Sequence, residues 1–477
     1  MASRLRPCRA TSMVRAELTL ICVSLFAVIA GCAPSDESRP GHPNLLLIVV
    51  DTLRADHLGA YGYPRETSPA IDALARAAIR FDRAYAAAPW TKPSVASMIT
   101  GLYPAALGID NVFSRLPQSA LTLAEILRAN GYRTAGVVSH VMLSNQWEMG
   151  FGQGYETYIE SEARGHRHIS TERVTDQAIA ILDDFANGTD PFLLFVHYFD
   201  PHFDYLDHRD IGFAPVDSES LDGDESIIEL RERIPTLSDS DFLFLRDRYD
   251  EEIRHTDAGV GRLLAALGRL DLESDTAVVF VSDHGEQFGE KGWIGHTPTL
   301  YEMVVRVPLI IRPPGRPVEP RVVDQPVSLV SLTPTVLEML GLESSDRGFQ
   351  ARSFASWLRS GPGDEMEDVV IEIDFPLQDP RISPVRLLRR AIVGKRFKLI
   401  VDDAIGTLEL YDLESDPDEQ RDLASARPLL RERMLAALRS RIAASRAQAV
   451  ATETVELSDS ELEVLRELGY VEGARPD

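Results

Sequence analysis

The stretch NLLLIVV at residues 44–50, followed by Asp51, decides the fold that the sequence predicts. A continuous apolar run of this length is typical of a strand buried on both faces, as in a parallel sheet covered by helices. Further buried strands are predicted at 134–139, 192–196 and 276–281, and helices at 69–78, 93–100, 121–129 and 250–270. Because strands and helices alternate along the chain, the sequence predicts an α/β fold with a doubly wound, mostly parallel sheet flanked by helices.

The pattern changes after about residue 350, where short apolar segments follow one another at hairpin-like spacing. They predict a small C-terminal antiparallel β subdomain with strands at 369–373, 387–393, 397–402 and 408–413, then a helix at 428–445. A second, capped helix is predicted at 457–470. Residues 204–248 are acidic and irregular, and we expect them to form a lid over the site. The predicted domains are a catalytic α/β domain at 43–350, the antiparallel subdomain with its helix at 351–447, and a helical tail at 448–477.

The N-terminal 31 residues predict an export signal, because a basic start precedes an apolar stretch at 18–30 that is too short to span a bilayer comfortably. The signal ends in Ile-Ala-Gly-Cys at 29–32, which resembles the lipobox of bacterial lipoproteins. That resemblance implies that Cys32 is lipidated, that 32–42 is a tether, and that the protein is held at the periplasmic or cell-surface face of a bacterial membrane. The alternative is an ordinary signal peptide, or a membrane anchor, with a chance cysteine.

Charge and cysteine content exclude some functions. The formal net charge is −25, and no basic stripe is present to attract a phosphate backbone, which argues against nucleic-acid binding. The three cysteines, Cys8, Cys22 and Cys32, all lie at or before the predicted cleavage point. The exported body would therefore contain neither disulfides nor cysteine-ligated metal.

Two predicted strand ends carry candidate metal ligands. Asp51 follows the strand at 44–50, and Asp283 with His284 follows the strand at 276–281. Ligands gather at the carboxyl ends of strands in open α/β sheets, and carboxylates with imidazole suit a divalent cation. A lone Asp after a strand is often a helix cap, but two such ends favour a metal site.

The segment Pro89–Ser94 contains a candidate nucleophile, Thr91. Thr91 comes just before a predicted helix whose first turn contains Pro93, so its hydroxyl would meet the positive end of the helix dipole. If the hydroxyl also touches the metal, both effects favour the alkoxide. The alternative is a plain N-cap threonine, which this segment alone favours.

Histidines and an aspartate cluster directly after the strand at 192–196, at His197, Asp200 and His202, and His296 lies in a glycine-containing loop. These side chains could stabilise charge on a bound oxyanion, protonate a leaving group or hold a second metal. The remaining histidines are expected on the surface or in helices: His57, His140, His166, His168, His208 and His255.

Five ordered segments resemble the sulfatase family of the alkaline phosphatase superfamily: NLLLIVVDTLRAD at 44–56, TKPSVASMITGLYP at 91–104, FVSDHGE at 280–286, LYEMVVRVPLII at 300–311 and LELYDLESDPDEQRDL at 408–423. The resemblance implies that Asp51, Asp283 and His284 bind the cation. Thr91 stands at the nucleophile position, where it would also touch the metal. Substrate contacts are implied for Asn111, His202 and His296, the two histidines being catalytic candidates, and Lys92 and His197 are further candidates for substrate contacts.

The sequence also departs from the family. Sulfatases mature a Cys or Ser to formylglycine, and Thr91 cannot simply give that aldehyde, so no formylglycine is expected. Val95 replaces the signature Arg, Thr52 replaces a second metal Asp, and the Gly-Lys-Trp-His segment is missing. A threonine nucleophile resembles instead the phosphodiesterases and phosphotransferases of the superfamily, commonly two-zinc enzymes. In that case Asp200, His202 and His296 are the candidates for the second metal site.

The predicted function is a metal-dependent, sulfatase-family hydrolase of sulfate or phosphate esters, with Thr91 forming a covalent enzyme ester. One divalent cation, or two, is expected, with zinc, manganese or calcium as the candidates. The substrate would be a small-molecule or glycan ester. The alternatives are a two-metal phosphodiesterase or phospho-group transferase, and an inactive sulfatase fold kept as a binding module.

Overall fold

The computed structural model describes residues 42–163, 170–203, 205–206, 208, 211, 213, 218, 220–315, 318–344, 347–361, 363, 367–375 and 387–470. The predicted export signal and Cys32 lie outside these residues. Within them, no helix is both long enough and apolar enough to cross a membrane.

The central sheet is built around β1 (Asn44–Val50), which is parallel to both of its neighbours, β6 (Phe192–Tyr198) and β7 (Thr276–Ser282). The strand order is β11-β2-β10-β7-β1-β6-β4-β5, with β12 also paired to β2. The other strands are β2 (Ile79–Tyr85), β4 (Arg133–Val138), β5 (Thr157–Ile159), β10 (Arg306–Arg312), β11 (Arg321–Val323) and β12 (Val327–Ser328). Strand β10 is antiparallel to β2 and β7, so the sheet is mixed but mostly parallel, as predicted.

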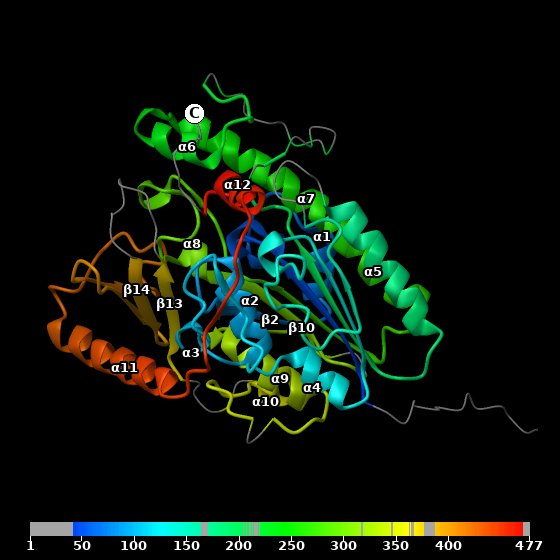
Figure 1. Cartoon of the computed structure of the whole chain (residues 1–477). Coiled ribbons are helices and arrows are strands. Elements are labelled where there is room, and N and C mark those ends of the chain that lie inside the picture. The colour runs from blue at the N-terminus through cyan, green and yellow to red at the C-terminus, as the bar shows by residue number, and fades with distance from the viewer. Residues whose placement is uncertain are drawn as a thin grey trace, which may run out of the picture. The chain divides into compact units, whose positions relative to one another are not determined.

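Helices cover both faces of this sheet (Figure 1). Alternate residues of β1 point to opposite faces, and all seven residues are buried. Leu45, Leu47 and Val49 join the core under α2 (Thr91–Thr100), α4 (Leu123–Ala129), α9 (Leu332–Met339) and α10 (Ala355–Ser360). Leu46, Ile48 and Val50 join the core under α1 (Pro69–Ala75), α5 (Thr171–Ala186) and α7 (Asp239–Arg269). This two-sided burial explains why β1 is a continuous apolar run, and the predicted α/β fold is confirmed.

The second sheet is antiparallel, in the order β13-β14-β15-β16. Its strands are β13 (Val369–Phe375), β14 (Leu387–Val393), β15 (Phe397–Asp402) and β16 (Thr407–Asp412), and α11 (Pro428–Arg446) follows. The predicted C-terminal antiparallel subdomain is therefore confirmed. The shorter elements are α3 (Pro104–Leu107), α6 (Ile227–Arg233), α8 (Glu302–Val305), α12 (Asp459–Glu467), β3 (Ser114–Arg115), β8 (Gln287–Phe288), β9 (Ile294–Gly295) and β17 (Glu453–Thr454).

One helix starts earlier than predicted. Helix α7 begins at Asp239 rather than near residue 250, because Ser238 and Asp241 form a capping box. Its first turns lie in the acidic segment 204–248, which also contains α6, so part of that segment is helical rather than irregular. Arg231 of α6 donates from Nε to the carbonyl of Ile294 at 3.0 Å, which ties α6 to the loop that carries His296.

Candidate functional site

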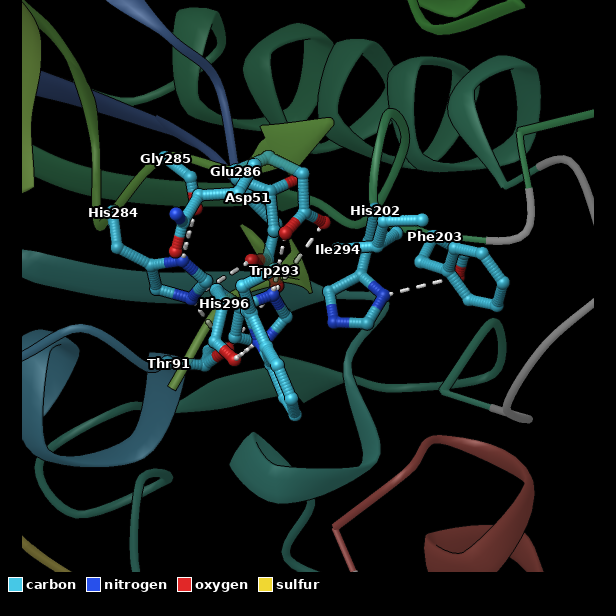
Figure 2. Close-up of polar contacts among 12 residues, drawn as sticks. Asp51, Thr91, His202, Phe203, His284, Gly285, Glu286, Trp293, Ile294 and His296 are labelled. Atoms are coloured by element: carbon cyan, nitrogen blue, oxygen red, sulfur yellow. Dashed lines mark hydrogen bonds and ion pairs between the residues drawn. The ribbon is translucent and has the colours of Figure 1, made fainter. Parts of the chain in front are cut away.

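The site lies at the carboxyl ends of two adjacent parallel strands. Val50 of β1 is in register with Ser282 of β7, so the next residues, Asp51 and Asp283, come side by side. His284 Nε2 lies 3.4 Å from Asp51 Oδ1 and 3.7 Å from Asp283 Oδ2. All three side chains are fully buried, and Figure 2 shows Asp51 beside His284. The structure thus brings together the three residues predicted to bind a metal.

Unpartnered carboxylate oxygens show that these residues fit a cation. Asp51 Oδ1 and Asp283 Oδ2 are buried and accept no hydrogen bond from the described part of the chain. Burial raises the pKa of the Asp51 carboxyl well above its usual value, and the nearby Asp283 and Glu286 carboxylates raise it further. Burial likewise raises the pKa of Asp283. Two buried carboxylates cannot both ionise cheaply without a compensating charge. Ligand atoms of Asp51, Asp283 and His284 all lie within 4.8 Å of one another, as a divalent metal requires.

Main-chain contacts orient His284 toward this group. Its Nδ1 lies 3.0 Å from the carbonyl of Gly285, a contact that requires the proton on Nδ1 and leaves Nε2 available to act as a ligand. Ser94 of α2 donates to the carbonyl of Asp283 at 2.6 Å. Helix α2 and the end of β7 are therefore held together at the site.

Thr91 is the first residue of α2, and Trp90 is the N-cap without a side-chain cap bond. The Thr91 Oγ1 atom lies 3.3 Å from His284 Nε2 and 3.5 Å from Asp51 Oδ2. The alternative of a plain N-cap threonine is therefore wrong. The hydroxyl is buried, faces the metal-binding group and sits at the positive end of a ten-residue helix, all of which favour an alkoxide.

Two histidines complete one side of the site. His296 Nδ1 lies 3.2 Å from Glu286 Oε1, and the His296 ring centroid is 4.4 Å from that of His284. His202 Nδ1 lies 3.1 Å from the carbonyl of Phe203. The ring centroids of His202 and His296 are 5.0 Å apart, so the two imidazoles lie next to each other (Figure 2).

His140 and His197 flank Asp51 from the other side. Their Nε2 atoms lie 3.7 and 3.8 Å from Asp51 Oδ2, and both rings are fully buried. Burial lowers the pKa of His197 to about 3 and that of His140 well below its usual value, so both are neutral. The prediction that His140 is a surface or helix residue is wrong, because β4 ends beside β6, one strand away from β1, and the residue after Ser139 therefore lies at the site.

Three other predicted site residues have structural roles. The Lys92 ammonium donates to the carbonyls of Val112 and Ser114, both at 2.6 Å, and burial lowers its pKa to about 7. The Asn111 amide oxygen accepts from the main chain of Phe113 and Ser114, which closes a turn. The substrate contacts predicted for Lys92 and Asn111 are therefore corrected, because these polar groups hold the 111–114 segment instead.

Asp200 is the third, and it caps a helix. Its carboxylate accepts from the main-chain N–H groups of Ser170 and Thr171 and from both hydroxyls, the shortest contact being 2.6 Å from Thr171 Oγ1. These bonds satisfy the N-terminus of α5. The second metal site predicted at Asp200, His202 and His296 is therefore corrected, since Asp200 turns away to α5 and His296 is paired with Glu286.

We expect Asp200→Asn to lower the free energy of unfolding by about 2 kcal/mol, because a buried amide replaces one carboxylate oxygen by a donor facing N–H groups. Metal content should stay that of the wild type. Thermal melts and metal analysis of the same preparations check this, and a loss of bound metal in Asp200→Asn would restore the two-metal prediction.

The histidines outside the site are also better buried than expected. His57 Nδ1 lies 2.7 Å from Asp250 Oδ1, and His208 stacks on His255 with ring centroids 4.4 Å apart. Both are buried, and His57 lies in a short 3-10 helix at Ala55–His57, which agrees with the surface or helix prediction, whereas His208 lies in neither place and that prediction is corrected. His166 and His168 lie outside the described residues.

Besides His140, sequence reasoning missed two further residues at the site. Glu286 follows His284 by two positions in the segment FVSDHGE, and its spacing to the metal strand could have singled it out. Burial raises the pKa of the Glu286 carboxyl to about 7. Tyr470, in the tail, places its hydroxyl 3.1 Å from His296 Nε2, and no sequence signal pointed to it.

The mixed α/β sheet carries carboxylates, a helix-terminal hydroxyl and imidazoles at the ends of its strands. The family model for sulfatases matches residues 43–342, and a model named for the C-terminal part of N-sulphoglucosamine sulphohydrolase matches 289–448. The chain therefore belongs to the sulfatase family, whose members hydrolyse sulfuric esters.

Relatives and neighbours agree with this family. The ulvan-active sulfatase of Formosa agariphila is 26% identical over 415 residues, which cover 81% of this chain and 78% of the relative. A structure solved with its substrate D-glucosamine-2-N,6-O-disulfate has a TM-score of 0.69 at 19% identity, covering 85% of this chain and 98% of the other. The phosphonate monoester hydrolase of Agrobacterium radiobacter has a TM-score of 0.69 at 22% identity, covering 88% and 99%. The two solved structures share the fold.

Proposed function

We propose that this sulfatase-family hydrolase uses unmodified Thr91 as its nucleophile on a sulfate or phosphate ester. The observation that carries the proposal is the position of the Thr91 hydroxyl, 3.3 Å from His284 Nε2 and 3.5 Å from Asp51 Oδ2 at the start of α2. A capping threonine would turn this hydroxyl back to its own helix. Here the hydroxyl faces the residues that would hold a cation.

The proposed reaction has two displacement steps. Thr91 Oγ bonds to the sulfur or phosphorus atom, the bond from that atom to the alcohol oxygen breaks, and the alcohol leaves with a proton. Water then attacks the same sulfur or phosphorus atom, the bond from that atom to Thr91 Oγ breaks, and sulfate or phosphate is released while Thr91 regains its hydroxyl proton. Asp51, Asp283 and His284 would hold a divalent cation, and when bound it would act as a Lewis acid on the nucleophile and the ester oxygens.

His296 is placed to supply the proton. If its Nδ1–H donates to Glu286, which lies 3.2 Å away, the carboxylate fixes the ring and favours the imidazolium, whose Nε2–H faces the site. The carboxylate–imidazole pair resembles other general acids in which a buried acid orients the ring. His202 would donate to a non-bridging oxygen of the same group.

A phosphorus ester is a specific second substrate class. A threonine ester has no hydroxyl on the carbon that bears it, so it cannot break down by elimination as a formylglycine hydrate ester does. Water must attack sulfur or phosphorus directly. The fold shared with a phosphonate monoester hydrolase supports phosphate or phosphonate esters, and the ulvan-active relative supports a sulfated glycan.

One panel tests the proposal. Protein without its predicted signal is assayed, after metal analysis, on 4-nitrophenyl sulfate, 4-nitrophenyl phosphate, phenyl phosphonate ester and bis(4-nitrophenyl) phosphate. We expect turnover of at least one ester and its loss after chelation. Metal-loaded protein without turnover on any of them would contradict the proposed function. The lipid on Cys32 and the exported location stay proposals, which metabolic labelling with a fatty acid and a Cys32→Ser control would test.

A further inference from the structure

The tail of the chain reaches the site through Tyr470. Its hydroxyl lies 3.1 Å from His296 Nε2 and 3.4 Å from His202 Nε2, and the residue is 6% exposed. Its ring centroid lies 6.2 Å from that of Trp90, the residue before the nucleophile. One phenol thus contacts both candidate catalytic histidines beside the nucleophile.

A series of backbone contacts delivers Tyr470 to this position. After α11, the chain donates from Val450 N to the carbonyl of Ala106, and β17 then pairs with β3. Helix α12 begins at a capping box formed by Ser458 and Glu461. Its C-terminus closes on Gly469, whose φ of +72° favours glycine, and the Tyr470 N–H donates to the carbonyl of Leu465 at 2.9 Å. The α12 segment appears in red in Figure 1.

Burial and packing show that this placement is specific. Leu465 is fully buried, and Leu468 and Tyr470 pack in the same core cluster as Trp90 and Phe375. The Gly469 position lies against Ile227 of α6, where an added Cβ would come within 2.6 Å of a side-chain carbon. The tail is therefore held on one side by the core of the site and on the other by α6.

The Tyr470 phenol shares its hydrogen-bonding capacity with the His202 and His296 imidazoles. His296 and His202 place their Nδ1 atoms against the Glu286 carboxylate and the Phe203 carbonyl, which accept hydrogen bonds. In the neutral rings both Nε2 atoms are then acceptors, and a single phenol O–H can satisfy one of them. Together these three side chains offer one phenol donor and two imidazole acceptors. If one imidazole is protonated and an anionic oxygen is bound, the phenol can accept a hydrogen bond from the imidazolium and donate one to the anion.

Two positions near Thr91 that could carry cationic hydrogen-bond donors do not offer one to a substrate. Val95 occupies the position at which the family signature has an Arg, and the Lys92 ammonium is committed to main-chain carbonyls. Burial raises the pKa of the Tyr470 hydroxyl well above its usual value.

We propose that Tyr470 is a catalytic residue supplied by the C-terminal segment, and that its phenol O–H donates a hydrogen bond to an oxygen of the group transferred to Thr91. No proton is transferred in this role. The inference rests on the proposed function, because it names a further contact within the same site. A hydrogen bond of this kind stabilises the negative charge that grows in the transition state.

The test compares Tyr470→Phe with Tyr61→Phe in the metal-loaded protein. Tyr61 is a matched control, because its hydroxyl lies 3.2 Å from the carbonyls of Phe81 and Leu309, inside the sheet. We expect Tyr470→Phe to lower kcat by roughly 10- to 100-fold with KM changed less than about twofold. Tyr61→Phe should keep kcat. Tyr470→Ala should lose at least as much kcat as Tyr470→Phe.

A binding measurement separates this inference from the proposed function. Calorimetric titration with inorganic phosphate should show at least a several-fold weaker Kd in Tyr470→Phe than in the wild type. If the wild type binds phosphate but turns over no ester, the proposed function fails while this contact is still measured.

Three outcomes would overturn the inference. Faster turnover with a lower KM in Tyr470→Ala would show that the tail obstructs the substrate. Unchanged kcat and phosphate Kd in Tyr470→Phe would show that the phenol only packs. Absence of both turnover and phosphate binding in the wild type would end the proposed function and the inference together.

Discussion

Replacing Thr91 by alanine is expected to lower kcat by at least about 10³-fold while leaving metal content and the thermal melt close to those of the wild type. The hydroxyl is the only atom group of Thr91 that faces both Asp51 and His284, so its loss removes the bond-forming atom. Steady-state kinetics on the preferred ester, with metal analysis of the same sample, measure this.

Two controls sharpen the Thr91 result. Ser97 lies in the same helix and is equally buried, and its hydroxyl has no hydrogen-bond partner among the described residues, so Ser97→Ala should keep full activity. Thr91→Ser keeps the hydroxyl and should retain part of the turnover. Rapid-quench experiments should trap a covalent ester on residue 91 in the wild type. Undiminished turnover in Thr91→Ala would remove Thr91 from the mechanism and leave the metal site standing.

Asp51→Asn is expected to abolish tight metal binding and with it at least about 10³-fold of kcat. Asp51 is central, because Oδ1 lies 3.4 Å from His284 Nε2 and Oδ2 lies 3.5 Å from the Thr91 hydroxyl. An amide offers one neutral oxygen where the carboxylate offers two charged ones. Metal analysis after dialysis, followed by kinetics at added metal, checks the expected loss.

Without metal, we expect Asp51→Asn to stabilise the protein rather than impair it. In the metal-free protein, burial raises the pKa of Asp51 and the like charges of Asp283 and Glu286 raise it further, which means that the ionised form destabilises the fold. Removing the charge should therefore raise the melting temperature of metal-free protein, while the melting shift on adding metal should disappear. A metal-induced shift as large as that of the wild type would contradict the assignment of Asp51 as a ligand. Asp200→Asn serves as the matched buried-aspartate control.

The parts of the fold and site that depend on local pattern could be predicted from the sequence. A run such as NLLLIVV is stable as a strand buried on both faces of a parallel sheet. The residue after it then lies at the carboxyl edge of that sheet. The same rule, applied to two strands, predicts that Asp51, Asp283 and His284 lie together. Pro93, in the first turn of the predicted helix, places Thr91 beside the start of that helix. The direction of the Thr91 hydroxyl, which points toward the strand ends rather than back to its own helix, depends on tertiary packing.

The errors arose where the partner of a side chain is distant in sequence. Asp200 reads as a ligand beside two histidines, but its partners are the N–H groups at the start of α5, 29 and 30 residues away. Tyr470 meets His202 across 268 residues, and a tyrosine at the end of a predicted terminal helix gives no signal of such a contact. Lysine side chains are usually exposed, yet Lys92 is fully buried. Its ammonium donates to two main-chain carbonyls that no sequence pattern predicts.

The contacts of Lys92 link the nucleophile helix to the tail. Its ammonium holds the carbonyls of Val112 and Ser114, Ser114 pairs with Thr454 of β17, and the strand leads on to α12. Because β3 and β17 have only two residues each, we expect the free energy needed to open this pairing to be low. We expect the tail to open from this short pairing before the central sheet unfolds. On heating, the molecule would lose its complete site before it loses its core, so activity would fade below the melting transition.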